Sequence, residues 1–137
     1  MSGSVRERCD AIEECYEFML AYAAQGVAGD AASPSAGQLR SLLAGAEDAL
    51  VGLADAFGAA VADAGLEPAA RYQAFLAVLD RDAQDSLAAV QLVLAQPAIS
   101  SQLIDNLNAS IHIRALLTDI FLIDEVLASH FRSTQAS

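Results

Sequence analysis

Histidine and cysteine are the residue types best suited to nucleophilic, acid–base or metal chemistry near neutral pH, and this sequence has two of each. His112 and His130 are eighteen residues apart, and no Glu-x-x-His motif of a di-iron helical protein occurs. Cys9 and Cys15 are six residues apart, which turns a helix through about 600° and points the two side chains away from each other. This spacing is not that of a redox pair, a zinc site or a haem attachment site. We therefore expect no metal and no cofactor.

The run from Ile111 to Thr118 resembles the sequence around the phosphoacceptor histidine of sensor histidine kinases. In that family the histidine stands three residues before an arginine. Here Ile111 occupies that position relative to Arg114, and His112 is one residue out of register. The resemblance therefore transfers no site. With no glycine-rich phosphate loop and no nucleophile beside an obvious base, we expect no catalytic residue and no enzyme activity.

The net charge of the chain limits the kinds of molecule that it can bind. The chain has 18 acidic residues and seven arginines, no lysine, and a net charge of −11. Such a surface repels nucleic-acid phosphates and anionic lipid headgroups, so we expect no binding to nucleic acids or membranes. It suits a basic protein partner, or it only keeps an apolar protein soluble. Arginine in place of lysine, with abundant alanine, indicates a GC-rich bacterial source.

Targeting signals are not recognisable in the sequence. Acidic residues interrupt the start of the chain, so it has no apolar signal segment. The longest uncharged stretch, 86–104, contains Pro97 and several Gln and Ser residues, which makes it a poor membrane span. We expect a cytoplasmic protein in which both cysteines stay reduced, with Cys15 the more exposed.

The periodicity that must position these residues is helical throughout. It predicts an all-α fold in which residues 1–137 form a single domain, a four-helix antiparallel bundle with long helices. The first helix is expected over Ser4–Gln25, where apolar residues repeat every three or four positions. Residues 26–37, rich in Gly and Ser, are expected to be a linker, and residues 133–137 a frayed tail.

Proline and glycine divide the rest of the chain. The second helix is expected from Ser33 or Ser35 to about Gly65, with Pro34 in its first turn. A stripe of small residues along it either admits another helix closely or is only tolerated in an alanine-rich helix. These close-packing candidates are Gly45, Ala49, Gly52 and Ala56.

Pro68 is expected to open the third helix, which runs to about Gln96 with Asp80, Asp82 and Asp85 facing water. Pro97 is expected to begin the fourth helix, capped by Gln96 or Ser100 and continuing to about Arg132. Along that helix Asp105, His112 and Asp119, with Asn108, would share one face.

The segment 111–127 is the most apolar part of the chain. A helix that is apolar over most of its circumference must be covered on most sides, and three neighbouring helices cover only part of it. We expect a second copy to cover the remainder, which predicts a homodimer formed through the fourth helix; coverage by another protein or by its own chain is the alternative. The interface candidates are Ile111, Ile113, Arg114, Leu116, Leu117, Ile120, Phe121, Ile123 and Leu127.

These features favour a non-catalytic protein-interaction module that self-associates, such as a helical adaptor, a chaperone-like protein or an assembly factor. The alternative is a protein that binds a small apolar ligand between its helices. Its pocket candidates, which would otherwise be ordinary core residues, are Tyr16, Phe18, Tyr22, Tyr72, Phe75 and His112.

Overall fold

The computed structural model describes residues 2–28 and 34–136, and within them it contains six helices and no strand. The predicted all-α class is therefore confirmed, whereas two of the four predicted helices are each divided in two. No helix among these residues is both long and apolar enough to cross a membrane. The helices are α1 (Ser2–Ala24), α2 (Pro34–Leu50), α3 (Leu53–Ala64), α4 (Ala69–Leu94), α5 (Ser101–Ala109) and α6 (His112–Ala136).

The helix ends follow the residue types that the sequence offers. Pro34 is the first residue of α2 and Pro68 directly precedes α4, where a missing backbone N–H is tolerated. Gly65 closes α3 in the left-handed conformation, with φ 65°. Ser100 caps α5, and its hydroxyl accepts a hydrogen bond from the Leu103 backbone N–H at 3.0 Å. Of the two predicted caps, Ser100 is the one observed, and the helix after Pro97 starts at Ser101.

The second predicted helix is interrupted at Gly52, which adopts φ 79°. The last turn of α2 leaves carbonyl oxygens without helical partners, and these carry partial negative charge. Arg8 of α1 supplies the missing donors: its guanidinium binds the carbonyls of Asp48 at 3.3 Å, Ala49 at 3.0 Å and Val51 at 2.5 Å. A left-handed glycine and a cation from another helix together fix this break.

Arg40 of α2 closes the end of α4 in the same way. Its guanidinium donates to the carbonyls of Leu94 at 3.2 Å and Gln96 at 2.5 Å. Two of the seven arginines thus serve as caps at helix C-termini, and each joins helices that are distant in sequence.

The fourth predicted helix is interrupted at Ile111, which adopts φ 66° although it is β-branched. A left-handed conformation costs such a residue on the order of 1–2 kcal/mol. Ser110 closes α5, and the Ile111 carbonyl accepts the first bond of α6 from Ala115 at 2.8 Å. Because α5 and α6 are separate, the predicted common face of Asp105, Asn108, His112 and Asp119 does not exist.

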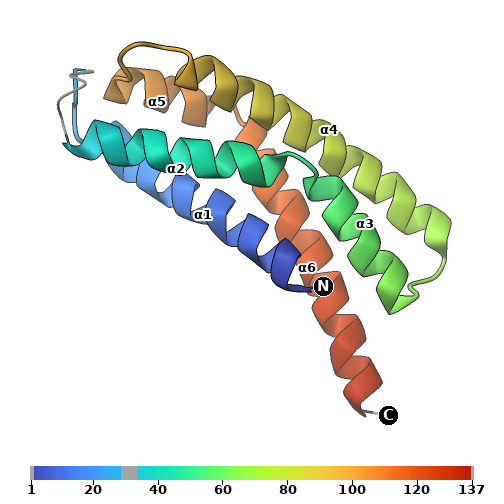
Figure 1. Ribbon diagram of the computed structural model, residues 1–137. Helices are drawn as coiled ribbons and strands as arrows, with labels where there is room; N and C mark the ends of the chain where they lie inside the picture. Colours follow the sequence, from blue (N-terminus) through green and yellow to red (C-terminus); the bar gives the residue numbers. More distant parts are fainter. Residues whose placement is uncertain (1, 29–33, 137) are drawn as a thin grey trace.

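The contacts of α6 with the other helices are concentrated on one neighbour. α1 packs against α2 and α5, and α4 packs against α2, α3 and α6. α6 meets mainly α4, has few contacts with α1, and its C-terminal part projects beyond the other helices (Figure 1). The core along α1 contains fully buried Cys9, Met19 and Tyr22, and Phe57 of α3 is equally enclosed.

A polar junction ties the end of α1 to the start of α5. The buried Ser101 hydroxyl accepts from the Val27 N–H at 2.8 Å and donates to the Tyr22 carbonyl at 2.5 Å. The Ser101 N–H donates to the Val27 carbonyl at 2.9 Å, and the Tyr22 hydroxyl donates to the Ile99 carbonyl at 2.5 Å. Every one of these buried groups is paired, so the junction stabilises one geometry of the chain.

Candidate functional site

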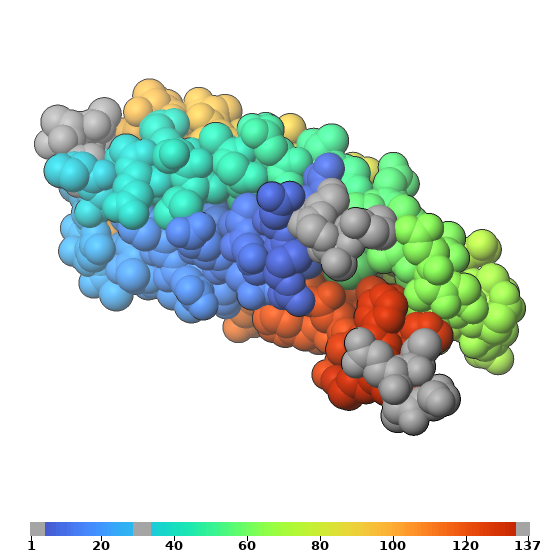
Figure 2. Space-filling model, turned by 60° about the horizontal axis from the view of Figure 1, so that its bottom comes forward, coloured from blue at the N-terminus to red at the C-terminus, as the bar shows by residue number. Residues whose placement is uncertain are grey.

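A groove lies between the α3–α4 turn and the C-terminal half of α6. It has a volume of about 570 Å³ and is open to solvent along its length. We call it the α6 groove. In Figure 2 the red end of α6 lies near the green helix α3, outside the part of the surface formed by α1 and α2. Its apolar lining consists of Leu66, Tyr72, Leu122 and Val126.

Acidic groups border the α6 groove. Glu67 lies in the α3–α4 turn and Glu125 on α6. Glu125 pairs with Arg132 at 2.9 Å, but both side chains are more than 60% exposed, so this ion pair is weak and exchangeable. α3 also ends at Gly65, in the groove wall, and the carbonyl end of a helix carries partial negative charge. The groove thus combines an apolar surface with an edge that favours cations.

A pair of carboxyl groups lies where α4 meets α6. Asp119 of α6 is half-buried next to Asp82 of α4, and burial, together with hydrogen bonding and charge from Asp82, raises the pKa of Asp119 to about 7. As two carboxylates, neither side chain can donate a hydrogen bond, and Oδ2 of Asp119 is enclosed without a partner. A proton shared by the pair supplies the missing donor. Of the carboxylates expected to face water, Asp80 and Asp85 are exposed, whereas Asp82 is only partly exposed.

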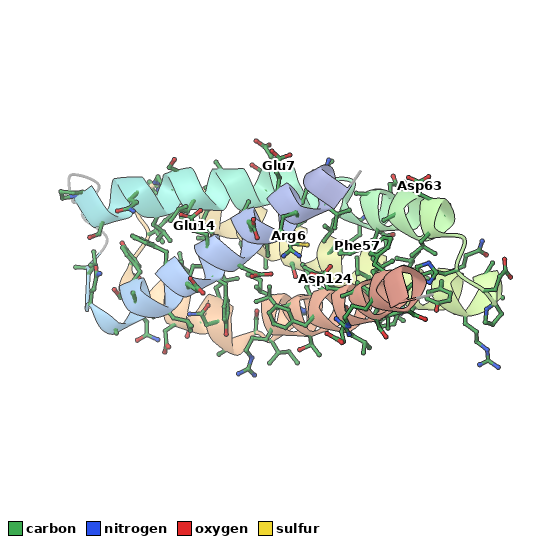
Figure 3. All side chains as sticks on the ribbon, turned by 90° about the horizontal axis from the view of Figure 1, so that it is seen from below. Arg6, Glu7, Glu14, Phe57, Asp63 and Asp124 are labelled. Atoms are coloured by element: carbon green, nitrogen blue, oxygen red, sulfur yellow. The ribbon has the colours of Figure 1, made fainter. Side chains whose placement is uncertain are left out.

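A second acidic group lies between α1 and α6. Figure 3 shows Arg6 of α1 and Asp124 of α6 in this region. The ion pair of Arg6 is with Asp10, four residues along the same helix, at 3.9 Å. Burial raises the pKa of Glu13, and the negative charge of Asp10 raises it further. Burial also raises the pKa of Asp124, and the positive charge of Arg6 partly offsets this increase. One arginine thus offsets several carboxylates along this contact. No group of three or more His, Cys, Asp or Glu side chains among the described residues is placed to hold a metal ion.

The predicted interface stripe is part of the core of a single chain, which corrects that prediction. Six of its nine residues are at most 8% exposed, because α6 turns this side toward α4 and the other helices. Three remain outside: Ile111 and Phe121 are each 55% exposed, and Arg114 is exposed as well. The buried residues are Ile113, Leu116, Leu117, Ile120, Ile123 and Leu127.

The small residues of the second predicted helix do not form one close-packing stripe. Nothing lies within 4 Å of a side chain built at Gly45, so no helix approaches there. Gly52 is required by its left-handed backbone at the α2–α3 break. Ala49 is buried and Ala56 is partly buried against the core, as ordinary helix residues are.

The predicted aromatic pocket is not assembled. Phe18 and Tyr22 stack with ring centroids 6.5 Å apart near the polar junction, where Tyr22 is fully buried. Tyr72 lies instead in the α6 groove. Tyr16 and Phe75 are partly buried against the core, and His112 is exposed at the start of α6. A void in the core, lined by Met19, Leu50 and Ile113 among others, measures about 10 Å³, room for at most one water molecule.

Both cysteines are buried, which corrects the expected exposure of Cys15. Burial raises the pKa of each thiol to about 12, so both stay protonated at neutral pH. A protonated, enclosed thiol is a poor nucleophile and a poor metal ligand.

Comparison with known proteins gives no family: no protein-family model, no curated protein and no solved structure matches the chain. The sites described above are therefore the basis for a functional proposal.

Proposed function

We propose that this chain is a non-catalytic protein-interaction module that self-associates through the exposed side of α6. In this proposal the six helices act as a four-helix antiparallel bundle, with α2 and α3 forming one bent rod and α5 and α6 another. The observation that carries the proposal is a pair of exposed aromatic side chains on α6, Phe121 at 55% and Phe131 at 51%.

These two residues belong to one side of the helix. Ala128 follows Phe121 by seven residues and precedes Phe131 by three, spacings that keep all three side chains on neighbouring positions. Phe131 also continues the spacing of the buried residues Ile120, Ile123 and Leu127, but it lies where α6 projects past the other helices. A second copy covering this side would remove two phenylalanines from water, which favours association.

Charge opposes the same association, because two copies of net charge −11 repel each other. We therefore expect a dimer that strengthens as added salt screens this repulsion. Sedimentation velocity should show dimer at concentrations of about 100 µM or below in 0.3 M salt, the range of a weak interface.

The matched variants are Phe121→Ser with Phe131→Ser, and Leu92→Ser as control. Leu92 is 66% exposed on a different helix, α4, and should leave the dimer unchanged. The double variant should sediment as a monomer. Wild-type protein that remains monomeric throughout, or a double variant that still dimerises, contradicts the proposal.

A small-ligand binder is the second candidate, and the size of the α6 groove is the observation that favours it. Its volume of about 570 Å³ lies within the range of small-molecule sites. A bound apolar compound should raise the melting temperature by mass action. A thermal-shift screen of lipids, tetrapyrroles and nucleotides, repeated on Leu122→Ala, checks this: a ligand of the groove loses its effect in the variant.

A further inference from the structure

We propose that the α6 groove binds a basic amphipathic helix of another protein. The groove is separate from the side of α6 that carries Phe121 and Phe131, since Leu122 and Val126 lie on a different part of the helix surface. This inference goes beyond self-association, and either one can fail alone.

The shape and secondary structure favour a helix as the occupant. The described residues form no strand, so they offer no sheet edge to which an extended peptide could add. One wall of the groove is α6 itself, where Leu122 and Val126 are one turn apart. Apolar residues of an incoming helix, spaced three or four apart, match that repeat and pack against Leu66 and Tyr72 from the opposite wall.

The charges favour a basic occupant over a second copy. Glu67 and Glu125 border the groove, and the C-terminal end of α3 adds partial negative charge. His130 also lines the groove, and Arg132 pairs with Glu125 from beside it; this exposed bond can be exchanged for a lysine or arginine of the partner. A second copy would bring a net charge of −11 to the same acidic border, which raises the free energy of that complex.

The probes are two designed peptides of about 18 residues, both with leucine at spacings of three and four. One has lysine at its other positions and the second has glutamate, and both residue types favour helix. Fluorescence anisotropy at 0.15 M salt should show saturable binding of the lysine peptide, about tenfold tighter than that of the glutamate peptide. Leu122→Ala should weaken binding about fivefold, since it removes apolar contact area.

Charge variants separate a site from diffuse attraction. Glu67→Lys with Glu125→Lys should weaken binding of the lysine peptide about tenfold. Glu14→Lys with Glu17→Lys changes the net charge equally, at exposed positions of α1, and should weaken it at most about twofold. Circular dichroism should show all variants equally helical.

Three results would overturn the proposal. If the two charge variants lose affinity for the lysine peptide equally, the peptide is attracted to the whole acidic surface. Stabilisation by a small apolar compound without peptide binding would assign the groove to a small ligand. If neither peptide binds and Leu122→Ala dissociates the dimer, then a second copy occupies the groove.

Discussion

The polar junction of α1 and α5 has its hydrogen bonds formed, whereas the polar groups where α4 meets α6 do not. At the junction of α1 and α5, Ser101 pairs with two backbone groups through its hydroxyl, and Tyr22 pairs with the Ile99 carbonyl. At the contact of α4 and α6, Oδ2 of Asp119 and the hydroxyl of Ser86 are enclosed without a partner. The first region should stabilise the fold, and the second should reduce its stability.

The difference explains which parts of the molecule respond to pH. The junction contains no group that titrates near neutrality, because burial raises the already high pKa of Tyr22 further. The α4–α6 contact contains Asp119, whose pKa burial and the neighbouring Asp82 raise to about 7. Proton release there leaves two carboxylates side by side and weakens the contact that holds α6 in place. We expect α1 and α5 to stay docked under conditions that loosen α6.

The largest expected effect is that of Ser101→Ala. The substitution removes the acceptor of the Val27 N–H, whereas the Tyr22 carbonyl keeps a bond from Gln25 at 3.1 Å. A part-buried donor left unpaired costs about 1–3 kcal/mol, so the free energy of unfolding should fall by about 2 kcal/mol. Urea unfolding measures this change. Ser41→Ala, at an exposed position of α2, is the control and should change it by less than about 0.5 kcal/mol.

The next effect is the pH dependence of the α4–α6 contact. The pKa of Asp119 is raised from 3.8 to about 7 in the folded protein, so the folded state binds the proton more tightly than the unfolded state. The contribution of Asp119 to stability is therefore fullest below about pH 4, falls as the pH rises toward about 7, and is then constant. Solvent screening of this half-buried group limits the loss to about 1–2 kcal/mol.

Asp119→Asn tests that assignment, because an amide cannot ionise and can donate to Asp82. At pH 8 the variant should be about 1–2 kcal/mol more stable than wild type, with a flatter profile between pH 5 and 8. Asp82→Asn should act alike, because it removes the neighbouring carboxylate that raises the pKa of Asp119. Asp85→Asn, at an exposed site on α4, should keep the wild-type profile. A profile that Asp119→Asn leaves unchanged would place the titration elsewhere.

Local patterns in the sequence were sufficient to predict the helices and many of their ends. The apolar repeat along residues 4–25 and the positions of Pro34, Pro68 and Gly65 all correspond to features of α1, α2, α3 and α4. These signals act within a turn or two of the chain. The two interruptions are different. In the sequence, Gly52 is one small residue among many. The helix break there depends on Arg8, which only the folded structure places at the end of α2.

The break at Ile111 could not be predicted from the sequence, because a β-branched residue is among the least expected at positive φ. Because the break is not predicted, the sequence pattern places Asn108 and Asp119 on a common face and makes the last helix too long. The α6 groove and the Asp82–Asp119 pair were missed for a related reason. Both depend on where α6 lies against α4 and α3, which the periodicity of one helix does not determine.

The smallest expected effect is that of Ser86→Ala, which removes the other unpaired group of the α4–α6 contact. The Ser86 hydroxyl lines the core void of about 10 Å³ together with Ile113 and Leu116. Enlarging this void by one oxygen costs about 0.3 kcal/mol, whereas burying an unpaired hydroxyl costs about 1 kcal/mol or more. We therefore expect a gain of about 0.5–1 kcal/mol beyond that of Ser41→Ala, which accounts for helix propensity alone. Urea unfolding measures both gains. If Ser86→Ala and Ser41→Ala raise the free energy of unfolding equally, the Ser86 hydroxyl is paired through a water molecule in the void. Asp119 is then the group that distinguishes this contact from the junction of α1 and α5.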